Sequence, residues 1–299
     1  MIQDSIKKII SMISKKKIVV AKDKGHLKEL IGKCIDNYGN NCDLNHIDTS
    51  LITDMSLLFY KSKFNGDISG WDTSNVQDMS FMFEYCSFNG DISKYNTGAV
   101  VDMTGTFKDS QFDGDISGWN TSNVKCIEYM FYNSPFNKDI SQWNTSSIEN
   151  MFGVFMFSSF NGDISQWNTT SVENMAKMFV SSSFEGDISQ WNTSSVTNMR
   201  EMFSESQVDS DISQWDVSNV KNMRYMFCNA NFSHDLSQWN TSNVQDMSCM
   251  FDNCKATVPY WAKIEDAQER KNTIEAYQIK KNLEQVLKEQ LKKVSILKI

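Results

Sequence analysis

The fold is decided by the stretch F-E-G-D-I-S-Q-W-N-T-S-S-V-T-N-M-R-E-M-F-S-E-S-Q, Phe184 to Gln207, because close copies of it recur every 24 residues. One position marks nine successive copies without slippage: Ile47, Trp71, Tyr95, Trp119, Trp143, Trp167, Trp191, Trp215 and Trp239. A fixed period of this length is typical of a solenoid, in which each coil stacks on the next. Solenoids usually act as frames that present a long binding surface.

The second half of each copy predicts a helix. Val196, Met199, Met202 and Phe203 follow one another at steps of 3, 3 and 1, which places them on one helical face. Thr193 lies just before this segment and is a candidate N-cap, since its hydroxyl can accept from a free amide of the first turn. We therefore expect roughly three helical turns in each coil.

The first half of each copy predicts a short strand. Phe184, Ile188 and Trp191 supply its apolar residues. Strands stacked in register would form a parallel sheet with about 4.8 Å between coils, so nine coils would span on the order of 43 Å. The anchor tryptophans are then expected to form a ladder in the core: Trp71, Trp119, Trp143, Trp167, Trp191, Trp215 and Trp239.

An aspartate recurs in every copy without exception: Asp43, Asp67, Asp91, Asp115, Asp139, Asp163, Asp187, Asp211 and Asp235. Carboxylates stacked at about 5 Å repel one another unless each accepts hydrogen bonds from the backbone amides of a turn. A calcium ladder is the alternative, but it needs a G-G-x-G-x-D rhythm and several oxygen ligands per ion. The sequence therefore favours a structural role for these aspartates.

The motif F-N-G-D-I-S-x-W-N/D-T/V-S-N-V-x-x-M-x-x-M-F-x-x-S/C resembles the repeat of the BspA-type leucine-rich-repeat proteins, which include the mycoplasma-type repeat family of unknown function. The resemblance covers residues 43–254. It implies an α/β, leucine-rich-repeat-like solenoid of nine 24-residue coils, each with a short parallel strand and a helix. In many members it also implies surface display with adhesion or protein binding.

The two ends of the chain differ from the repeats. Residues 2–13 predict an amphipathic helix, residues 18–20 a short strand, and residues 27–35 a second helix. Residues 276–294 have helical periodicity, which suits either a cap on the last coil or a partner-binding arm. We expect an N-terminal cap over residues 1–42, the nine coils over 43–254, and a C-terminal helical cap over 255–299.

Charge is divided unevenly along the chain. Residues 43–254 hold 27 acidic and 10 basic side chains, whereas residues 1–42 and 255–299 are both net basic. An acidic body repels phosphate, which argues against direct nucleic-acid binding and favours a protein partner with a basic surface. Solubility alone is an alternative explanation of the same charge.

The sequence lacks the motifs of catalysis and metal binding. The three histidines lie far apart, and the seven cysteines include no C-x-x-C pair. Nucleophile elbows, P-loops and dinucleotide fingerprints do not occur. We predict no enzymatic activity and no catalytic residue, cofactor or metal. The sequence has neither a secretory signal nor a run of 18 apolar residues, so we expect a cytoplasmic protein without a membrane partner.

These observations predict a non-enzymatic scaffold for protein–protein interaction. One alternative is an inhibitor or immunity protein, bacterial or of phage origin, that blocks the basic groove of a nucleic-acid-binding enzyme such as a nuclease. Another is a surface adhesin whose export signal is missing from this sequence. The oligomeric state stays open. The candidate partner-binding residues are exposed glutamates of the repeats: Glu128, Glu149, Glu173, Glu201 and Glu205.

Overall fold

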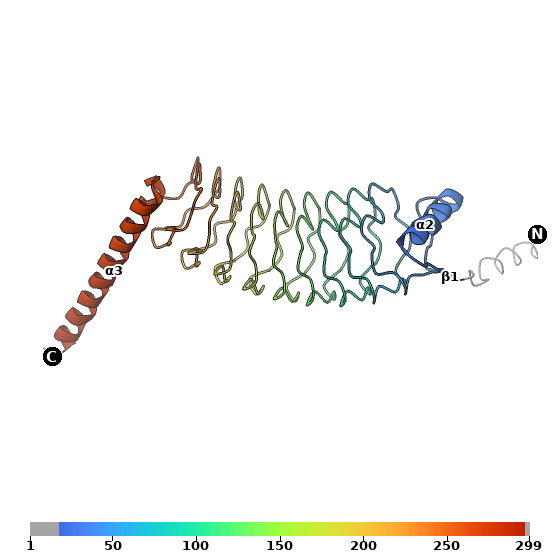
Figure 1. Ribbon diagram of the computed structural model, residues 1–299, viewed down its shortest axis with the longest axis horizontal. Helices are drawn as coiled ribbons and strands as arrows, with labels where there is room; N and C mark the ends of the chain where they lie inside the picture. The colour runs from blue at the N-terminus through green and yellow to red at the C-terminus, as the bar shows by residue number, and fades with distance from the viewer. Residues whose placement is uncertain (1–17, 297–299) are drawn as a thin grey trace, which may run out of the picture.

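The computed structural model describes residues 18–296, with side chains to residue 291. Coils of chain follow one another along a single axis, with helix α2 at one end and helix α3 at the other (Figure 1). The predicted helix over residues 2–13 lies outside the described residues. The described elements are β1 (Val19–Val20), α2 (Lys24–Tyr38), β2 (Ile47–Asp48), the 3-10 helix η1 (Tyr260–Lys263) and α3 (Ala267–Ile296).

The repeats contain neither the predicted helix nor the predicted strand. Between residues 49 and 259 the described chain forms turns and isolated parallel bridges. The bridges link one position of each coil to the same position of the next, from Asp54↔Asp78 to Asn222↔Asp246. They lie in the half of the coil that was expected to be helical, so the predicted α/β composition of each coil is wrong.

The reason is an alternation of hydrogen bonds that an apolar pattern does not reveal. The amides of Met55, Leu57 and Phe59 donate to carbonyls of the next coil at 2.8–2.9 Å. The intervening amides, such as that of Leu58, donate to the residue three positions earlier and close turns. Leu57 and Lys61 have left-handed φ values of 55°, and a left-handed residue every four positions cannot continue an α-helix. The turns still direct the Met and Phe side chains inward at the spacing of a helix.

Aromatic ladders fill the core. Phe59 stacks on Phe83 with ring centroids 5.4 Å apart, and Trp143 stacks on Trp167 at 6.4 Å. The ring of Trp167 is buried, and its Nε1 donates to the carbonyl of Ile140 at 3.1 Å. The same bond recurs for every anchor tryptophan of the repeats, so each indole ties its coil to the preceding one. Stacked rings of this kind add to the stabilisation from burial.

Three side-chain oxygens hold the bends of a typical coil. In one coil these are Oδ1 of Asp139, Asn144 and Asn150, and each accepts from the amide two residues later at 2.9–3.1 Å. Asp and Asn are favoured at such turns because their short side chains can satisfy a nearby backbone amide. These bonds explain why Asp or Asn recurs at nearly every copy of the three positions, Cys126 being an exception.

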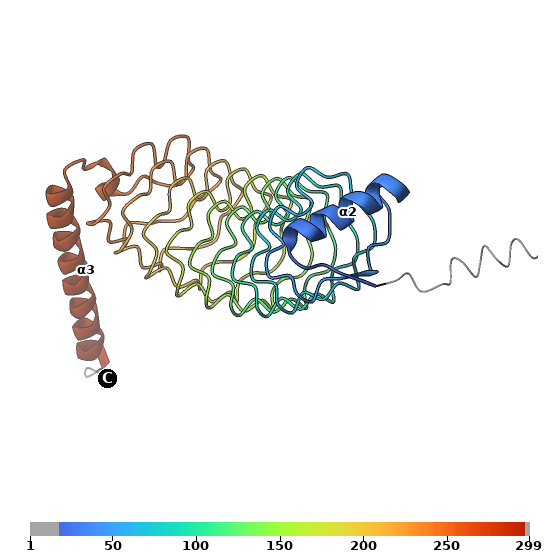
Figure 2. The same cartoon turned by 45° about the vertical axis from the view of Figure 1, so that its right-hand side comes forward.

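The N-terminal cap covers the first coil. Strand β1 pairs with β2 in parallel register, with Val19 opposite Ile47. Helix α2 begins after Asp23, whose carboxylate accepts from the amide of His26 at 2.8 Å. The helix lies at the end of the coils (Figure 2). It buries Leu27, Ile31 and Cys34.

The C-terminal cap imitates one more coil. Trp261 lies outside the 24-residue register, yet it is fully buried and its Nε1 donates to the carbonyl of Leu236 at 3.2 Å, as the anchor tryptophans do. Arg270 and Ile274 of α3 are also buried. The rest of α3 leaves the body (Figures 1 and 2), and its apolar side chains are exposed: Ile279, Leu283, Val286, Leu287 and Leu291. The first turns of α3 therefore cap the last coil, and the later turns project as an arm.

Candidate interaction surface

Variation between the coils is concentrated at four positions of the turn that follows each bridge. In the first coil these are Ser56, Leu57, Tyr60 and Lys61, and in the last coil Ser248, Cys249, Asp252 and Asn253. We call the surface formed by these positions in all nine coils the variable face. Most of its side chains are exposed or half-buried, whereas the Phe and Met residues between them point into the core. The variable face is thus the part of the repeat that is least constrained by packing.

Exposed and half-buried rings gather on the N-terminal half of the variable face. Tyr129 contacts Phe152 at 5.0 Å between ring centroids, and Tyr132 contacts Phe157 at 5.6 Å. All these contacts are edge-on, unlike the parallel stacking in the core. We call the following six residues the aromatic strip: Tyr60, Tyr85, Tyr129, Tyr132, Phe152 and Phe157.

Two lysines lie over the rings of the aromatic strip. The Nζ of Lys61 is 4.9 Å from the ring centroid of Tyr60, and that of Lys108 is 5.6 Å from that of Tyr85. Lys108 also pairs with Glu84 at 2.6 Å. Burial by itself would lower the pKa of Lys108, but the hydrogen bond and charge of Glu84, together with the charges of Tyr85 and Asp109, outweigh it and the pKa is raised. Both lysines are therefore cations held against aromatic faces, a favourable arrangement.

The backbone under the strip adopts a conformation that suits glycine better than an aromatic residue. Tyr85, Tyr129 and Phe157 have left-handed φ values of 54°, 54° and 59°. Bulky residues are rare there, because Cβ crowds the following carbonyl. Gly153 occupies in the next coil the position that Tyr129 has in its own, and a Cβ on Gly153 would lie 2.7 Å from the Tyr129 ring. The glycine therefore makes room for the ring of the neighbouring coil.

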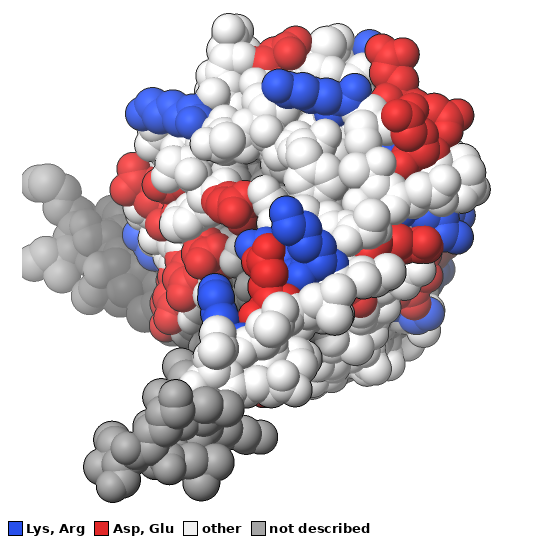
Figure 3. Space-filling model, turned by 90° about the vertical axis from the view of Figure 1, so that its left-hand side faces the viewer, with Lys and Arg blue, Asp and Glu red and all other residues white. Residues whose placement is uncertain are grey.

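Charged residues replace the rings on the C-terminal half of the variable face. Glu201 pairs with Lys177 at 3.2 Å and with Arg200 at 2.7 Å. The guanidinium of Arg224 lies 4.8 Å from the ring centroid of Tyr225. Figure 3 shows acidic and basic side chains interspersed at the end of the molecule that carries α3. This half of the face therefore combines both signs of charge.

The five predicted glutamates do not share one position in the coil. Glu128, Glu201 and Glu205 belong to the variable face, whereas Glu149 and Glu173 occupy the position just before the bridge residue. Glu128 is half-buried, and burial raises its pKa although Asn150 donates to its carboxylate at 3.1 Å. Glu149 pairs with Lys125 at 2.9 Å. The aromatic strip was not identified from the sequence. Its rings contact one another between neighbouring coils, whereas the five glutamates lie at different positions of the coil.

Most of the acidic charge of the repeats serves the turns. Sixteen of the 27 acidic side chains in residues 43–254 accept a hydrogen bond from the amide two residues later. The bond from the Ser141 amide lowers the pKa of Asp139, and the bond from Ser165 does the same for Asp163. Negative charge on this protein is therefore in large part a consequence of how its coils bend.

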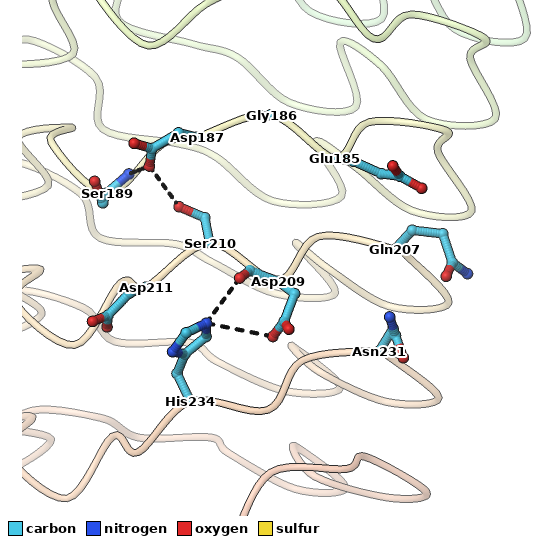
Figure 4. A pocket seen from close by; sticks show the side chains of 10 residues that line it. All are labelled: Glu185, Gly186, Asp187, Ser189, Gln207, Asp209, Ser210, Asp211, Asn231 and His234. Atoms are coloured by element: carbon cyan, nitrogen blue, oxygen red, sulfur yellow. Dashed lines mark hydrogen bonds and ion pairs between the residues drawn. The ribbon is translucent and has the colours of Figure 1, made fainter.

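An acidic hollow of about 610 Å³ lies on a different part of the coils (Figure 4). It contains Glu185, Asp187 and Asp211, and His234 bonds the carbonyl of Asp209 at 2.8 Å. Asp187 and Asp211 each accept from the backbone of their own turn. Within residues 18–296 no group of three or more His, Cys, Asp or Glu side chains could hold a metal ion. The hollow marks a break in a ladder of Asn and Asp side chains that runs from Asn65 to Glu185 and resumes at Asp209.

These features define a repeat protein whose constant frame carries one variable surface. The family of Mycoplasma proteins of unknown function, DUF285, matches four overlapping regions, residues 27–135, 110–208, 156–264 and 181–286, and the chain belongs to this family. No curated protein and no solved structure matches the chain. Among the described helices, none is long and apolar enough to cross a membrane.

Proposed function

We propose that this protein is a non-enzymatic scaffold that binds a partner protein through its variable face. The observation that carries the proposal is the placement of Tyr85, Tyr129 and Phe157 at left-handed positions. Gly, Asn or Asp would be less strained there, and the chain uses them in other coils, as at Gly105, Asn133 and Asn229. Backbone strain at exposed or half-buried surface residues points to a function for the side chain.

The chemistry of the variable face indicates the kind of partner. Tyrosine is enriched at protein interfaces because one end of its side chain is apolar and the other is polar. The charged half around Glu201 and Arg224 can fix the orientation of a partner through complementary charges. A protein surface with apolar side chains beside basic and acidic groups fits both halves.

The proposal is tested with a partner captured from the native host and then purified. Binding to the wild type is compared with binding to a triple variant, Tyr60→Ser, Tyr85→Ser and Phe157→Ser. The matched control replaces exposed apolar residues outside the face, Leu51→Ser and Val101→Ser. We expect the triple variant to lose at least tenfold in affinity, and the control to bind as the wild type does. Equal binding of all three proteins would contradict the proposal.

A second candidate function is inhibition of a nucleic-acid-binding enzyme. It is favoured by the line of aspartates at one position of successive coils, from Asp67 to Asp235, because a row of carboxylates resembles the charge of a phosphate backbone. Each aspartate uses Oδ1 in its turn, as Asp139 does. Inhibition of a purified nuclease that weakens steeply with salt would support this candidate, and inhibition lost in the aromatic triple variant would favour the first.

A further inference from the structure

The last coil ends in a row of backbone donors. In the coil before it, the amides of Met223, Tyr225, Phe227 and Asn229 donate to the next coil at 2.7–3.0 Å. The corresponding amides of the last coil belong to Met247, Cys249, Phe251 and Asn253. Within residues 18–296 these four amides have no acceptor. We call residues 247–253 the corner of the last coil. Its free amides form the donor pattern of an open sheet edge.

The remainder of the same coil is covered. Trp261 donates to the carbonyl of Leu236 at 3.2 Å, and the guanidinium of Arg270 donates to the carbonyls of Thr241 and Val244. The C-terminal cap thus makes the contacts that a tenth coil would make with Leu236, Thr241 and Val244 of the ninth coil. The described residues of the cap do not extend over the corner. The open donors are a local feature of the corner.

Two hollows lie along this corner. One, of about 200 Å³, is lined by apolar side chains such as Met250, Phe251 and Val258 together with Asp252. The other, of about 360 Å³, is lined in part by Asp246, Glu265 and Arg270. We call the donor row and the two hollows together the terminal groove. The terminal groove combines backbone donors, a floor for apolar side chains and a partly acidic rim.

We propose that the terminal groove binds a peptide segment of a partner protein, which adopts the turns of a coil and lies parallel to residues 247–253. The segment would accept hydrogen bonds at alternate carbonyls, as the next coil does elsewhere in the chain, which is analogous to recognition by strand addition. Within the chain, the seated segment inserts apolar side chains at Met223, Met226 and Phe227, so the peptide needs apolar residues at i, i+3 and i+4. Asp246, Asp252 and Glu265 at the rim favour lysine or arginine beside them.

A whole second copy fits the groove less well than a single segment does. The first coil carries matching carbonyls at Asp54, Ser56, Leu58 and Tyr60, none of which accepts a backbone bond within the described residues. However, α2 covers that coil and α3 covers the last one, and a helix is about 10 Å wide. Strand pairing requires about 4.8 Å between chains. The two caps would keep the edges apart.

The probe is a synthetic peptide with the sequence of residues 220–230, V-K-N-M-R-Y-M-F-C-N-A, which is seated on the preceding coil within the chain itself. Amide hydrogen exchange of the full chain is followed by NMR. We expect the amides of Met247, Cys249, Phe251 and Asn253 to exchange faster than those of the preceding coil, and to slow at least tenfold when the peptide is added. A peptide with the same residues in scrambled order provides the control for composition.

A pair of variants tests the site. Val258→Arg fills the smaller hollow and should weaken peptide binding at least tenfold, whereas Val101→Arg, at an equally exposed valine of 40%, should not. Slow exchange of the four amides without peptide would overturn the proposal, as would protection that appears only with rising protein concentration. Equal protection by the scrambled peptide would also overturn it. The terminal groove includes the last coil of the variable face but lies apart from the aromatic strip, on which the test of the proposed function rests, so failure here leaves the proposed function standing.

Discussion

Aspartate in this protein is a residue of turns. Asp139 and Asp163 are exposed, and each accepts from the backbone amide two residues later at 2.9 Å. Asn144 does the same at another bend of the coil at 3.1 Å. What these positions require is therefore an oxygen acceptor on a short side chain. The sequence predicts that each aspartate of this line accepts from a backbone amide of a turn, and the bonds of Asp139 and Asp163 have this form.

The lowered pKa values of these aspartates predict acid sensitivity. Because the folded pKa lies below the ordinary value of 3.8, each bond contributes its full stability above that value, and the contribution is lost as pH falls through the folded pKa. We expect urea midpoints to be flat between pH 7 and about 5 and to fall below about 4. The double variant Asp139→Asn, Asp163→Asn should fall less steeply. An acid loss as large as that of the wild type would argue against this linkage.

Truncation of an anchor tryptophan is expected to lower the free energy of unfolding strongly. Trp167 is buried and ties its coil to Ile140, so Trp167→Ala should lower the free energy of unfolding by about 3–5 kcal/mol. Trp261→Ala should have a similar effect, because its ring is also buried and bonded. Val101→Ala, at an exposed site, should stay within about 0.5 kcal/mol of the wild type. Denaturant melts that show either tryptophan variant as stable as the control would refute the anchor role.

At the scale of elements, apolar spacing predicted the period and the core but not the local backbone. Val196, Met199, Met202 and Phe203 are all buried, as a helical face would be. A chain of tight turns with left-handed residues at Glu201 and Glu205 buries the same positions. The two structures differ in where the amides donate, and side-chain spacing carries no information on that. The aromatic strip was missed for the same reason, since its left-handed positions were placed on a helix.

The exposure of the later turns of helix α3 predicts that they can be removed without loss of stability. Arg270 and Ile274 are buried, whereas Ile279 and Leu283 are about 60% exposed. Removal of residues 279–299 should leave the melting temperature unchanged, because the side chains described there, residues 279–291, are exposed. A fall comparable to that caused by Trp261→Ala would show that the later turns also stabilise the last coil.

At the scale of the whole molecule, which has a net charge of −8, the acidic side chains have two roles. Some accept the bonds that form the turns, and the others remain on the surface. Eleven of the 27 acidic side chains of residues 43–254 remain outside the bonds that shape the bends, among them Glu149, Glu173 and Glu205. These groups can still steer a basic partner. Composition alone could not separate the two roles, because a carboxylate that caps a turn and one that attracts a partner are the same residue type.

Steering by the remaining glutamates predicts a salt effect on association. The Debye length falls from about 30 Å at 0.01 M to about 8 Å at 0.15 M, so the association rate should drop over this range. Charge reversal at Glu149, Glu173 and Glu205 should reduce the rate at low salt and flatten its salt dependence, as measured by stopped-flow binding. If the rate is independent of salt and equal in the wild type and the triple lysine variant, the acidic surface contributes to solubility and not to association.

The central claim is that partner recognition belongs to the variable face, and photo-crosslinking tests it most directly. A benzophenone amino acid is placed at Tyr85 or Phe157 on that face, and at Gln142 or Gln166 outside the face, all of which are exposed. In the native host, the first two positions should crosslink to a common partner protein and the last two should not. Crosslinks to that partner from Gln142 and Gln166, with none from Tyr85 and Phe157, would contradict the claim.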